Sequence, residues 1–226
     1  MKTATVLIGV GRYQDRWHDY VATGAEVARL LHAEGFDVVL RALKLSGVRD
    51  IGGSDLVVVN AGYGEYGAVA DGPEDEWAQA YDHLREYRAG GGAILALHAA
   101  SNSLDDLPEW REWIGGHWVN GRSMHPPIGQ ATVQISQAEH PVTAGLSDFT
   151  LFDEMYSYQY VAPESEVLVS HTYDDRTHPL VWATESDGRR ALYDALGHDV
   201  RSFASPGRCE LLRREVRWLV GDTSGT

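Results

Sequence analysis

The 226-residue sequence contains only one cysteine, Cys209, so it cannot form an internal disulfide or supply a cysteine-based zinc site. Basic residues are also scarce, because 19 Lys and Arg stand against 33 Asp and Glu, a formal net charge of −14. Nucleic-acid binding normally requires a basic surface that neutralises phosphates, so this balance argues against such a partner. No segment approaches the ~20 apolar residues of a membrane span. We therefore expect a soluble, cytoplasmic protein with no nucleic-acid or membrane partner.

The amino-acid composition is that of a folded domain. Hydrophobic residues make up 43% and aromatic residues 10%, which excludes a disordered chain. A chain of this length buries roughly 70% of its unfolded surface. No repeat, low-complexity tract or Pro/Ser linker divides it, so we predict a single domain over residues 1–226. The apolar start, residues 5–10, lacks a leader cleavage pattern and is predicted to be a buried strand.

Strands and helices alternate in the first half of the sequence. Apolar runs predict strands over 5–10, 36–40, 55–60 and 93–97, and periodicity predicts helices over 18–34 and 73–88. Val21, Ala25, Ala28, Leu30 and Leu31 are predicted on one face of the first helix. The second half predicts a short helix at 110–113, strands at 131–136, 166–171, 180–184 and 190–195, and a helix at 207–220. This alternation indicates an α/β fold with a mostly parallel sheet and helices on both faces.

Ligands of such sheets bind beyond the carboxyl ends of the strands, which directs attention to residues 12–18, 62–66 and 98–103. In the last of these, a buried strand runs into small residues and then polar ones, as in a nucleophile elbow. The tip of this elbow would be His98 or Ala99 instead of the usual serine or cysteine. Ser101 and Ser103 stay open as serine nucleophiles. The alternative is that His98 only ends its strand with a hydrogen bond.

Three further side chains fall at predicted strand ends. His198 follows Gly197 after a late strand, His18 follows the first strand, and Glu154 lies in an acidic pair among large residues. Imidazole titrates near neutrality and therefore suits a general base or a metal ligand. None of these residues has a local metal-binding spacing. If the fold gathers them with His98, three imidazoles and a carboxylate would suit Zn²⁺ or another first-row divalent ion. The alternatives are an exposed helix start for His18 and a turn for Glu154.

The order of these motifs resembles that of the ThuA-like family (trehalose utilisation proteins). This family belongs to the class I glutamine amidotransferase-like superfamily of flavodoxin-like folds. The resemblance covers nearly the whole chain. It is carried by residues 90–100, 113–116, 125–126, 140–146, 153–156, 178–182 and 195–199.

The resemblance implies that this chain has lost one catalytic residue of the superfamily and has retained the form of another catalytic region. The superfamily's cysteine nucleophile is replaced by His98-Ala99, which implies that glutaminase activity is absent. Its C-terminal His-x-Glu region is retained in form as Gly197-His198-Asp199. Relatives that look like metal binders often carry further histidines after this motif, whereas residues 200–206 contain none. The family is associated with disaccharide utilisation, through oxidised (3-keto) sugars.

These observations lead to a sugar-processing enzyme, a hydrolase, lyase or isomerase, as the first hypothesis. Its partner would be a small-molecule sugar, and a homo-oligomer is possible. A non-catalytic sugar-binding protein on the same fold is the alternative. Aromatic faces pack on sugar C–H groups, although core packing is the default for tryptophan. The predicted catalytic residues are His98, His198 and Glu154, the metal ligands are His18, His98, Glu154 and His198, and the substrate-binding residues are Tyr63, Tyr66, Trp118 and His125.

Overall fold

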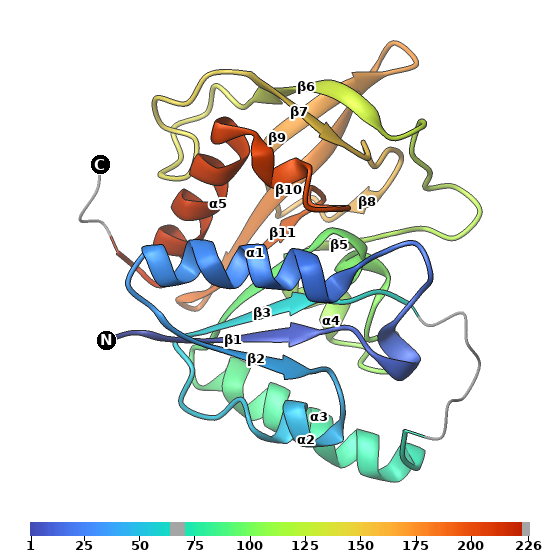
Figure 1. The fold of residues 1–226 in the computed structure, drawn as a ribbon, viewed down its shortest axis with the longest axis vertical. Coiled ribbons are helices and arrows are strands. Elements are labelled where there is room, and N and C mark those ends of the chain that lie inside the picture. Colours follow the sequence, from blue (N-terminus) through green and yellow to red (C-terminus); the bar gives the residue numbers. More distant parts are fainter. Residues whose placement is uncertain (64–70, 223–226) are drawn as a thin grey trace.

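A nine-stranded mixed sheet runs through the protein, in a computed structural model that describes residues 1–63 and 71–222 (Figure 1). Its strand order is β2-β1-β3-β4-β11-β10-β9-β6-β7, and β5 and β8 form a separate two-stranded sheet. The strands are β1 (Thr3–Ile8), β2 (Asp37–Ala42), β3 (Leu56–Asn60), β4 (Ala93–Leu97), β5 (Gly116–His117), β6 (Gly129–Ile135), β7 (Phe149–Asp153), β8 (Tyr160–Val161), β9 (Glu166–Tyr173), β10 (Arg176–Ser186) and β11 (Arg189–Asp194).

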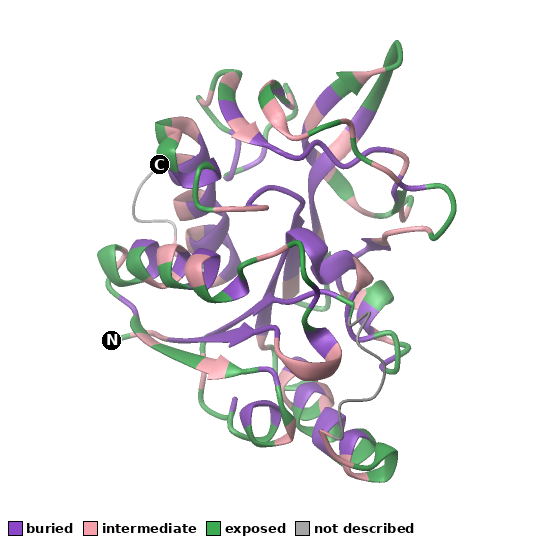
Figure 2. Ribbon diagram, turned by 45° about the vertical axis from the view of Figure 1, so that its right-hand side comes forward, coloured by how far each residue is buried: buried purple, intermediate pink, exposed green. Residues whose placement is uncertain are grey.

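The five strands from β2 to β11 are mutually parallel, in the 2-1-3-4-5 order of flavodoxin-like folds. Every residue of β3 and β4 is buried, because helices cover both faces of this part of the sheet (Figure 2). The strands β10, β9, β6 and β7 continue the sheet with antiparallel pairing. The predicted α/β, flavodoxin-like class is confirmed, with an antiparallel extension from the second half.

The helices lie on the two faces of the sheet (Figure 1). One face carries α1 (Tyr20–Ala33) and α5 (Pro206–Leu219), which contact each other, and the other carries α2 (Leu45–Arg49) and α3 (Glu74–Ala89). A short helix, α4 (Trp110–Trp113), precedes β5. Short 3₁₀ turns lie at Gly11–Tyr13, His98–Asn102 and Ser202–Ala204. No helix of the described residues is long and apolar enough to cross a membrane.

The first helix confirms its predicted ends, but it confirms its predicted face only at Leu30 and Leu31. Asp19 caps the N-terminus by accepting the Ala22 N–H, and Gly35 follows the C-terminus with φ +84°, a conformation that favours glycine. Val21, however, is 65% exposed. Its neighbours Ala25 and Ala28 are exposed and half-buried. The buried side chains are Tyr20, Thr23, Gly24, Val27, Leu30 and Leu31.

Close approach of the helix to the sheet explains this rotation. A Cβ atom at Gly24 would lie 2.1 Å from Cδ1 of Ile8, so glycine allows this contact without a shift of the Ile8 side chain. The amide of Asn60 then donates hydrogen bonds to Thr23 Oγ1 and to the Tyr20 carbonyl oxygen, each at 3.0 Å. Polar and small residues therefore form part of the buried face, which an apolar pattern cannot reveal.

Candidate active site

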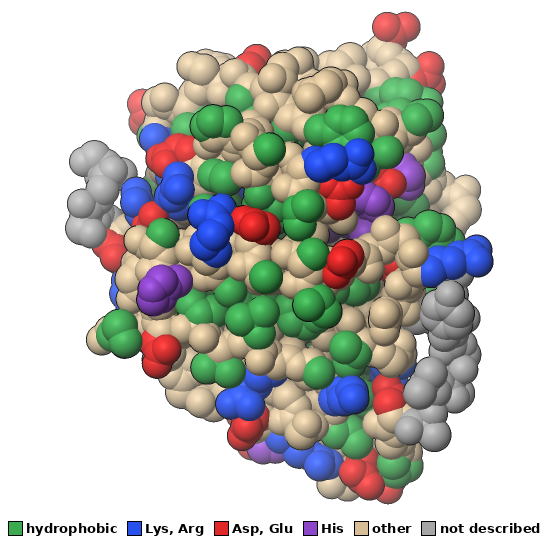
Figure 3. All heavy atoms as spheres, viewed as in Figure 1, with side chains coloured by type: hydrophobic (Ala, Val, Ile, Leu, Met, Phe, Trp, Pro, Cys, Tyr) green, Lys and Arg blue, Asp and Glu red, His purple; other side chains and the backbone are tan. Residues whose placement is uncertain are grey.

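Four side chains from distant parts of the sequence meet at one edge of the sheet. They are His18, His98, Glu154 and His198, and one ligand atom from each lies within 4.8 Å of all the others. His18 precedes α1, and the other three follow the ends of β4, β7 and β11. In Figure 3, histidine and acidic side chains gather on the right-hand side, beyond the N-terminal end of α1. The fold thus brings together the complete set that we predicted as metal ligands.

His98 stands at the tip of the predicted elbow. Its φ is +47°, a left-handed backbone conformation that is costly for a non-glycine residue. Two contacts hold it: Nδ1 lies 2.6 Å from the Ala195 carbonyl oxygen, and the Tyr193 hydroxyl donates to the His98 carbonyl oxygen at 2.8 Å. Ala99 and Ala100 are buried beside it, as the sharp turn requires. The alternative of a simple strand-ending hydrogen bond does not explain this backbone.

The two serines after the elbow are sealed inside the protein. Ser101 is 2% exposed and donates its hydroxyl hydrogen to Gln159 Oε1 at 3.2 Å. Ser103 is 1% exposed. Neither serine lines the hollow next to the four-residue cluster. The geometry therefore gives no support to a serine nucleophile.

His18 is oriented by Asp15, a residue to which the sequence analysis gave no role. Both carboxylate oxygens of Asp15 contact Nδ1 of His18, at 2.7 and 2.8 Å, and Oδ2 also accepts the Tyr20 hydroxyl at 2.6 Å. Burial raises the pKa of Asp15, but the His18 and Tyr20 contacts outweigh it and hold this pKa below its ordinary value. Asp15 is therefore a carboxylate, and Nδ1 of His18 carries the hydrogen.

Two imidazole nitrogens of the cluster, Nε2 of His18 and Nε2 of His98, face each other. A carbonyl oxygen can only accept, so Nδ1 of His98 is the protonated nitrogen, as is Nδ1 of His18. In the neutral rings both Nε2 atoms then carry lone pairs, and they lie 3.1 Å apart. Burial lowers the pKa of His18, which keeps its ring neutral. A proton or a cation between the two nitrogens would relieve the repulsion between these lone pairs.

Glu154 lies between the histidines. Its Oε2 is 3.1 Å from Nδ1 of His198 and 3.6 Å from Nε2 of His98. Burial raises the pKa of Glu154, but His198 and His98 outweigh it, so this pKa lies well below its ordinary value. Conversely, burial lowers the pKa of His198, but the carboxylate outweighs it and this pKa is raised. The two groups form an ionised carboxylate and an imidazole that holds its proton more tightly than usual.

Asp153, also given no role by the sequence analysis, fixes Glu154 relative to His198. This carboxylate is 1% exposed and accepts four hydrogen bonds. Three come from the backbone N–H groups of Glu154, Gly197 and His198, at 2.9, 2.8 and 3.0 Å, and one comes from the Ser202 hydroxyl at 2.6 Å. They join the end of β7 to the turn after β11. Two residues of the cluster therefore depend on one buried acid.

The other acid of this region does not reach the cluster. Asp199 follows His198 in sequence, but its carboxylate pairs with the guanidinium of Arg201. That ion pair holds the pKa of Asp199 below its ordinary value. Arg201 also stacks on the Phe152 ring, with its guanidinium carbon 4.1 Å from the ring centroid.

An open hollow of about 580 Å³ lies over the cluster. Three predicted substrate-binding residues line it, namely Tyr63, Trp118 and His125, whereas Tyr66 lies outside the described residues. The sequence analysis missed Trp17, Asn102, Asn120 and Tyr156, which also line the hollow. A second hollow, of about 600 Å³ along residues 136–146, contains none of the four cluster residues.

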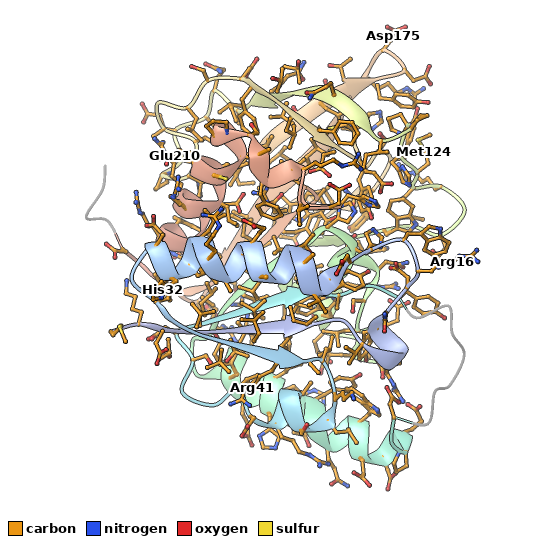
Figure 4. All side chains as sticks on the ribbon, viewed as in Figure 1. Arg16, His32, Arg41, Met124, Asp175 and Glu210 are labelled. Carbon is orange, nitrogen blue, oxygen red and sulfur yellow. The ribbon has the colours of Figure 1, made fainter. Side chains whose placement is uncertain are left out.

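The hollow has aromatic walls and no Lys or Arg among its described lining residues. The closest basic side chain in sequence, Arg16, extends outward from this edge of the molecule (Figure 4) and lies over the Trp17 ring. His125 stacks on Tyr156, with ring centroids 5.8 Å apart, and its Nδ1 is 3.5 Å from Oε1 of Glu154. Sequence spacing alone could not reveal these walls, because they come from four separate loops.

Comparison with known proteins shows which sequence family and which folds this chain matches. A family model described as trehalose utilisation, ThuA, matches residues 5–219. The comparison with curated proteins found no match. The fold is similar to that of a ThuA-like protein from Parabacteroides merdae, with a TM-score of 0.80 and 20% identity over 100% of this chain and 92% of that chain.

Two further structures show how widely the fold is shared. A ThuA-like protein from Bacteroides uniformis has a TM-score of 0.72 and 20% identity, over 100% of this chain and 94% of that chain. PurLQS from Thermotoga maritima has a TM-score of 0.58 and 11% identity, over 96% of this chain and 99% of that chain. Amidotransferase-like folds are thus among the structural neighbours.

Proposed function

The chain belongs to the ThuA family, whose description is trehalose utilisation, and from this premise we propose that it is a carbohydrate-processing enzyme acting on a disaccharide or its keto derivative. One observation carries the proposal: His18, Glu154 and His198 line an open, aromatic-walled hollow, and the buried His98 completes their cluster. Proton-transfer groups that line such a hollow can reach a bound ring, and the aromatic walls can pack on its C–H groups.

Glu154 and His198 are suited to move a proton in opposite directions. Their mutual contact at 3.1 Å separates their pKa values, with Glu154 lowered and His198 raised. Such separated pairs are how protein sites assign base and acid roles. Glu154 accepts a proton from the substrate, and His198 donates one to a carbonyl or glycosidic oxygen. General acid–base help of this kind contributes about 10²–10⁴ in rate.

The four residues also fit a divalent metal ion such as Zn²⁺. The Nε2 atoms of His18 and His98 face each other at 3.1 Å, and Nδ1 of His198 lies 3.1 Å from Oε2 of Glu154. Three imidazoles and one carboxylate are a nitrogen and oxygen set that zinc accepts. A bound metal would polarise a substrate oxygen as a Lewis acid. The Asp15 and Ala195 contacts would orient the two histidines toward it.

The charge of the hollow supports a neutral sugar. No Lys or Arg lines its described part, and residues 64–70, outside that part, contain none either. A phosphorylated or acidic sugar normally requires such a cation. The buried carboxylates of Asp15 and Glu154 would repel an anion further.

The proposed function does not include glutaminase activity, because His98 stands at the elbow where an amidotransferase has its cysteine. The single cysteine, Cys209, is buried in α5, and its sulfur donates to the Phe203 carbonyl oxygen. It cannot serve as the nucleophile of an amidotransferase. The elbow instead places an imidazole where that chemistry would need a thiol.

Turnover of 3-keto-disaccharides by the wild type, His98→Ala and His198→Ala tests the proposal. Each variant should lose about 10²–10⁴ in kcat, because proton transfer and its alignment are removed. His32→Ala is the matched control, since His32 is an exposed histidine at the far end of α1 (Figure 4). Equal rates in all four proteins would refute the proposed roles. Binding of the sugar without turnover by the wild type would instead support a sugar-binding protein.

A further inference from the structure

Tyr156 is the aromatic side chain that packs directly on the cluster. Its ring centroid lies 4.3 Å from that of His98, at an interplanar angle of 31°. Trp118 meets it edge-on at 4.7 Å, and His125 stacks on it at 5.8 Å. The residue is 5% exposed. Three rings therefore hold the Tyr156 ring in one orientation.

The backbone of this segment is fixed as well. Nε2 of His171 lies 3.1 Å from the Tyr156 carbonyl oxygen, within hydrogen-bond distance. The next residue, Ser157, pairs in both directions with Met124 through backbone hydrogen bonds of 3.1 and 2.7 Å. Because ring and backbone are both held, the hydroxyl of Tyr156 has a defined position in a residue that lines the hollow.

This hydroxyl differs from those of the other buried tyrosines. Tyr13 and Tyr81 donate to Asp106, Tyr20 donates to Asp15, and Tyr193 donates to the His98 carbonyl oxygen. Across residues 1–63 and 71–222, no protein group accepts a hydrogen bond from the hydroxyl of Tyr156, and this oxygen is not among the buried atoms that are sealed without a partner. A hydroxyl that solvent reaches and no protein group pairs is normally hydrogen-bonded to water, which a ligand can displace.

We propose that Tyr156 is a further catalytic residue of this site, whose hydroxyl donates a hydrogen bond to the carbonyl oxygen of a keto sugar. This inference rests on the proposed function. Glu154 takes the proton from the carbon next to the carbonyl, the C–H electron pair forms a C=C bond, and the carbonyl π pair moves onto oxygen. The Tyr156 hydroxyl stabilises that oxygen without losing its own proton. Return of a proton to the same carbon, on either face, restores the C=O bond and completes a step with no net oxidation.

Tyr156→Phe tests this role, because it removes one oxygen atom and keeps the ring between His98 and Trp118. Loss of a hydrogen-bond donor to a developing oxyanion lowers kcat by about 10²–10³. We expect that loss for 3-keto-disaccharide turnover, with KM changed less than about 10-fold, since a neutral hydrogen bond contributes less in the ground state. The urea midpoint of unfolding and the zinc content should match those of the wild type.

A second measurement does not depend on turnover. Calorimetric titration of the metal-stripped protein with the 3-keto-disaccharide should give a dissociation constant about 3–10-fold higher for Tyr156→Phe. Tyr160→Phe is the matched control, because Tyr160 is 44% exposed and packs on His117, outside the hollow. It should behave as the wild type does in both measurements.

The outcomes separate this inference from the proposed function. A wild type that turns over the keto sugar while Tyr156→Phe retains its kcat overturns the role of Tyr156 alone. The same holds if Tyr156→Phe loses activity together with its zinc or its stability, because the role is then structural. A wild type that neither binds nor turns over the sugar overturns the proposed function and this inference with it.

Discussion

Replacing Asp153 by asparagine should disrupt the connection between Glu154 and His198. In the structure, Oδ1 accepts the N–H groups of Glu154 and His198, and Oδ2 accepts the Gly197 N–H and the Ser202 hydroxyl. An amide has only one acceptor oxygen. If its nitrogen replaces Oδ2, Ser202 can rotate and accept from it, but the Gly197 N–H then loses its acceptor.

The cost follows from this count of hydrogen bonds. One buried N–H without a partner costs about 1–3 kcal/mol. The remaining bonds also lose the strength that an ionised acceptor gives them. We therefore expect Asp153→Asn to lower the free energy of unfolding by about 2–3 kcal/mol, out of the ~5–15 kcal/mol typical of a domain. Turnover should fall as well, since Glu154 and His198 lose their common anchor.

Urea denaturation followed by circular dichroism measures the first effect. Ser202→Ala is the graded control, because it removes one of the four bonds and should cost about 1 kcal/mol. Asp199→Asn is the neutral control, since its carboxylate pairs with Arg201 at the surface and should change stability by less than about 0.5 kcal/mol. A change below about 0.5 kcal/mol for Asp153→Asn would show that the anchor does not hold this turn.

Three further predictions concern metal affinity and pH. Asp15→Asn should weaken Zn²⁺ binding by about 10–100-fold in a chelator competition, because His18 loses the carboxylate that orients it; unchanged affinity would remove Asp15 from the site. Zn²⁺ affinity should fall as pH drops, starting above the ordinary imidazole pKa of about 6.5, because the pKa of His198 is raised and imidazoles must lose their protons to bind; a flat profile by calorimetry would exclude histidine ligands. Glu215 is fully buried, and burial, followed by the Asp194 charge, raises its pKa well above the ordinary value. The folded state thus keeps a proton that the unfolded state releases, so this contribution to stability is present below about pH 4.5 and lost as pH rises; Glu215→Gln should flatten that dependence in urea titrations at several pH values.

Much of the site could be predicted from the sequence because the carboxyl ends of parallel strands converge. His98 and His198 follow β4 and β11, which are paired neighbours in the sheet. His18 follows β1 through a short turn. Once an α/β alternation was recognised, these positions had to share an edge. The elbow at His98 could also be predicted, because small residues flank it.

Other parts of the site depend on contacts that a one-dimensional pattern does not contain. Asp15 and Asp153 act by accepting hydrogen bonds from residues that fold next to them, and Asp153 reaches residues 44 to 49 positions away. Tyr156 belongs to a motif that drew attention for its acids, and its packing on His98 spans 58 positions of the chain. The strand β7 was missed because only part of it is buried. The predicted face of α1 was wrong at Val21, Ala25 and Ala28, because Gly24 and Thr23 pack inward.

Metal analysis of the wild-type protein, purified without an affinity tag, tests the central claim most directly. The claim is that His18, His98, Glu154 and His198 act as one site. We expect one equivalent of zinc or another first-row divalent ion per chain, and its loss in His98→Ala but not in the exposed-residue control His32→Ala. A wild type that binds no such ion, or a His98→Ala variant that retains the full equivalent, would contradict the account.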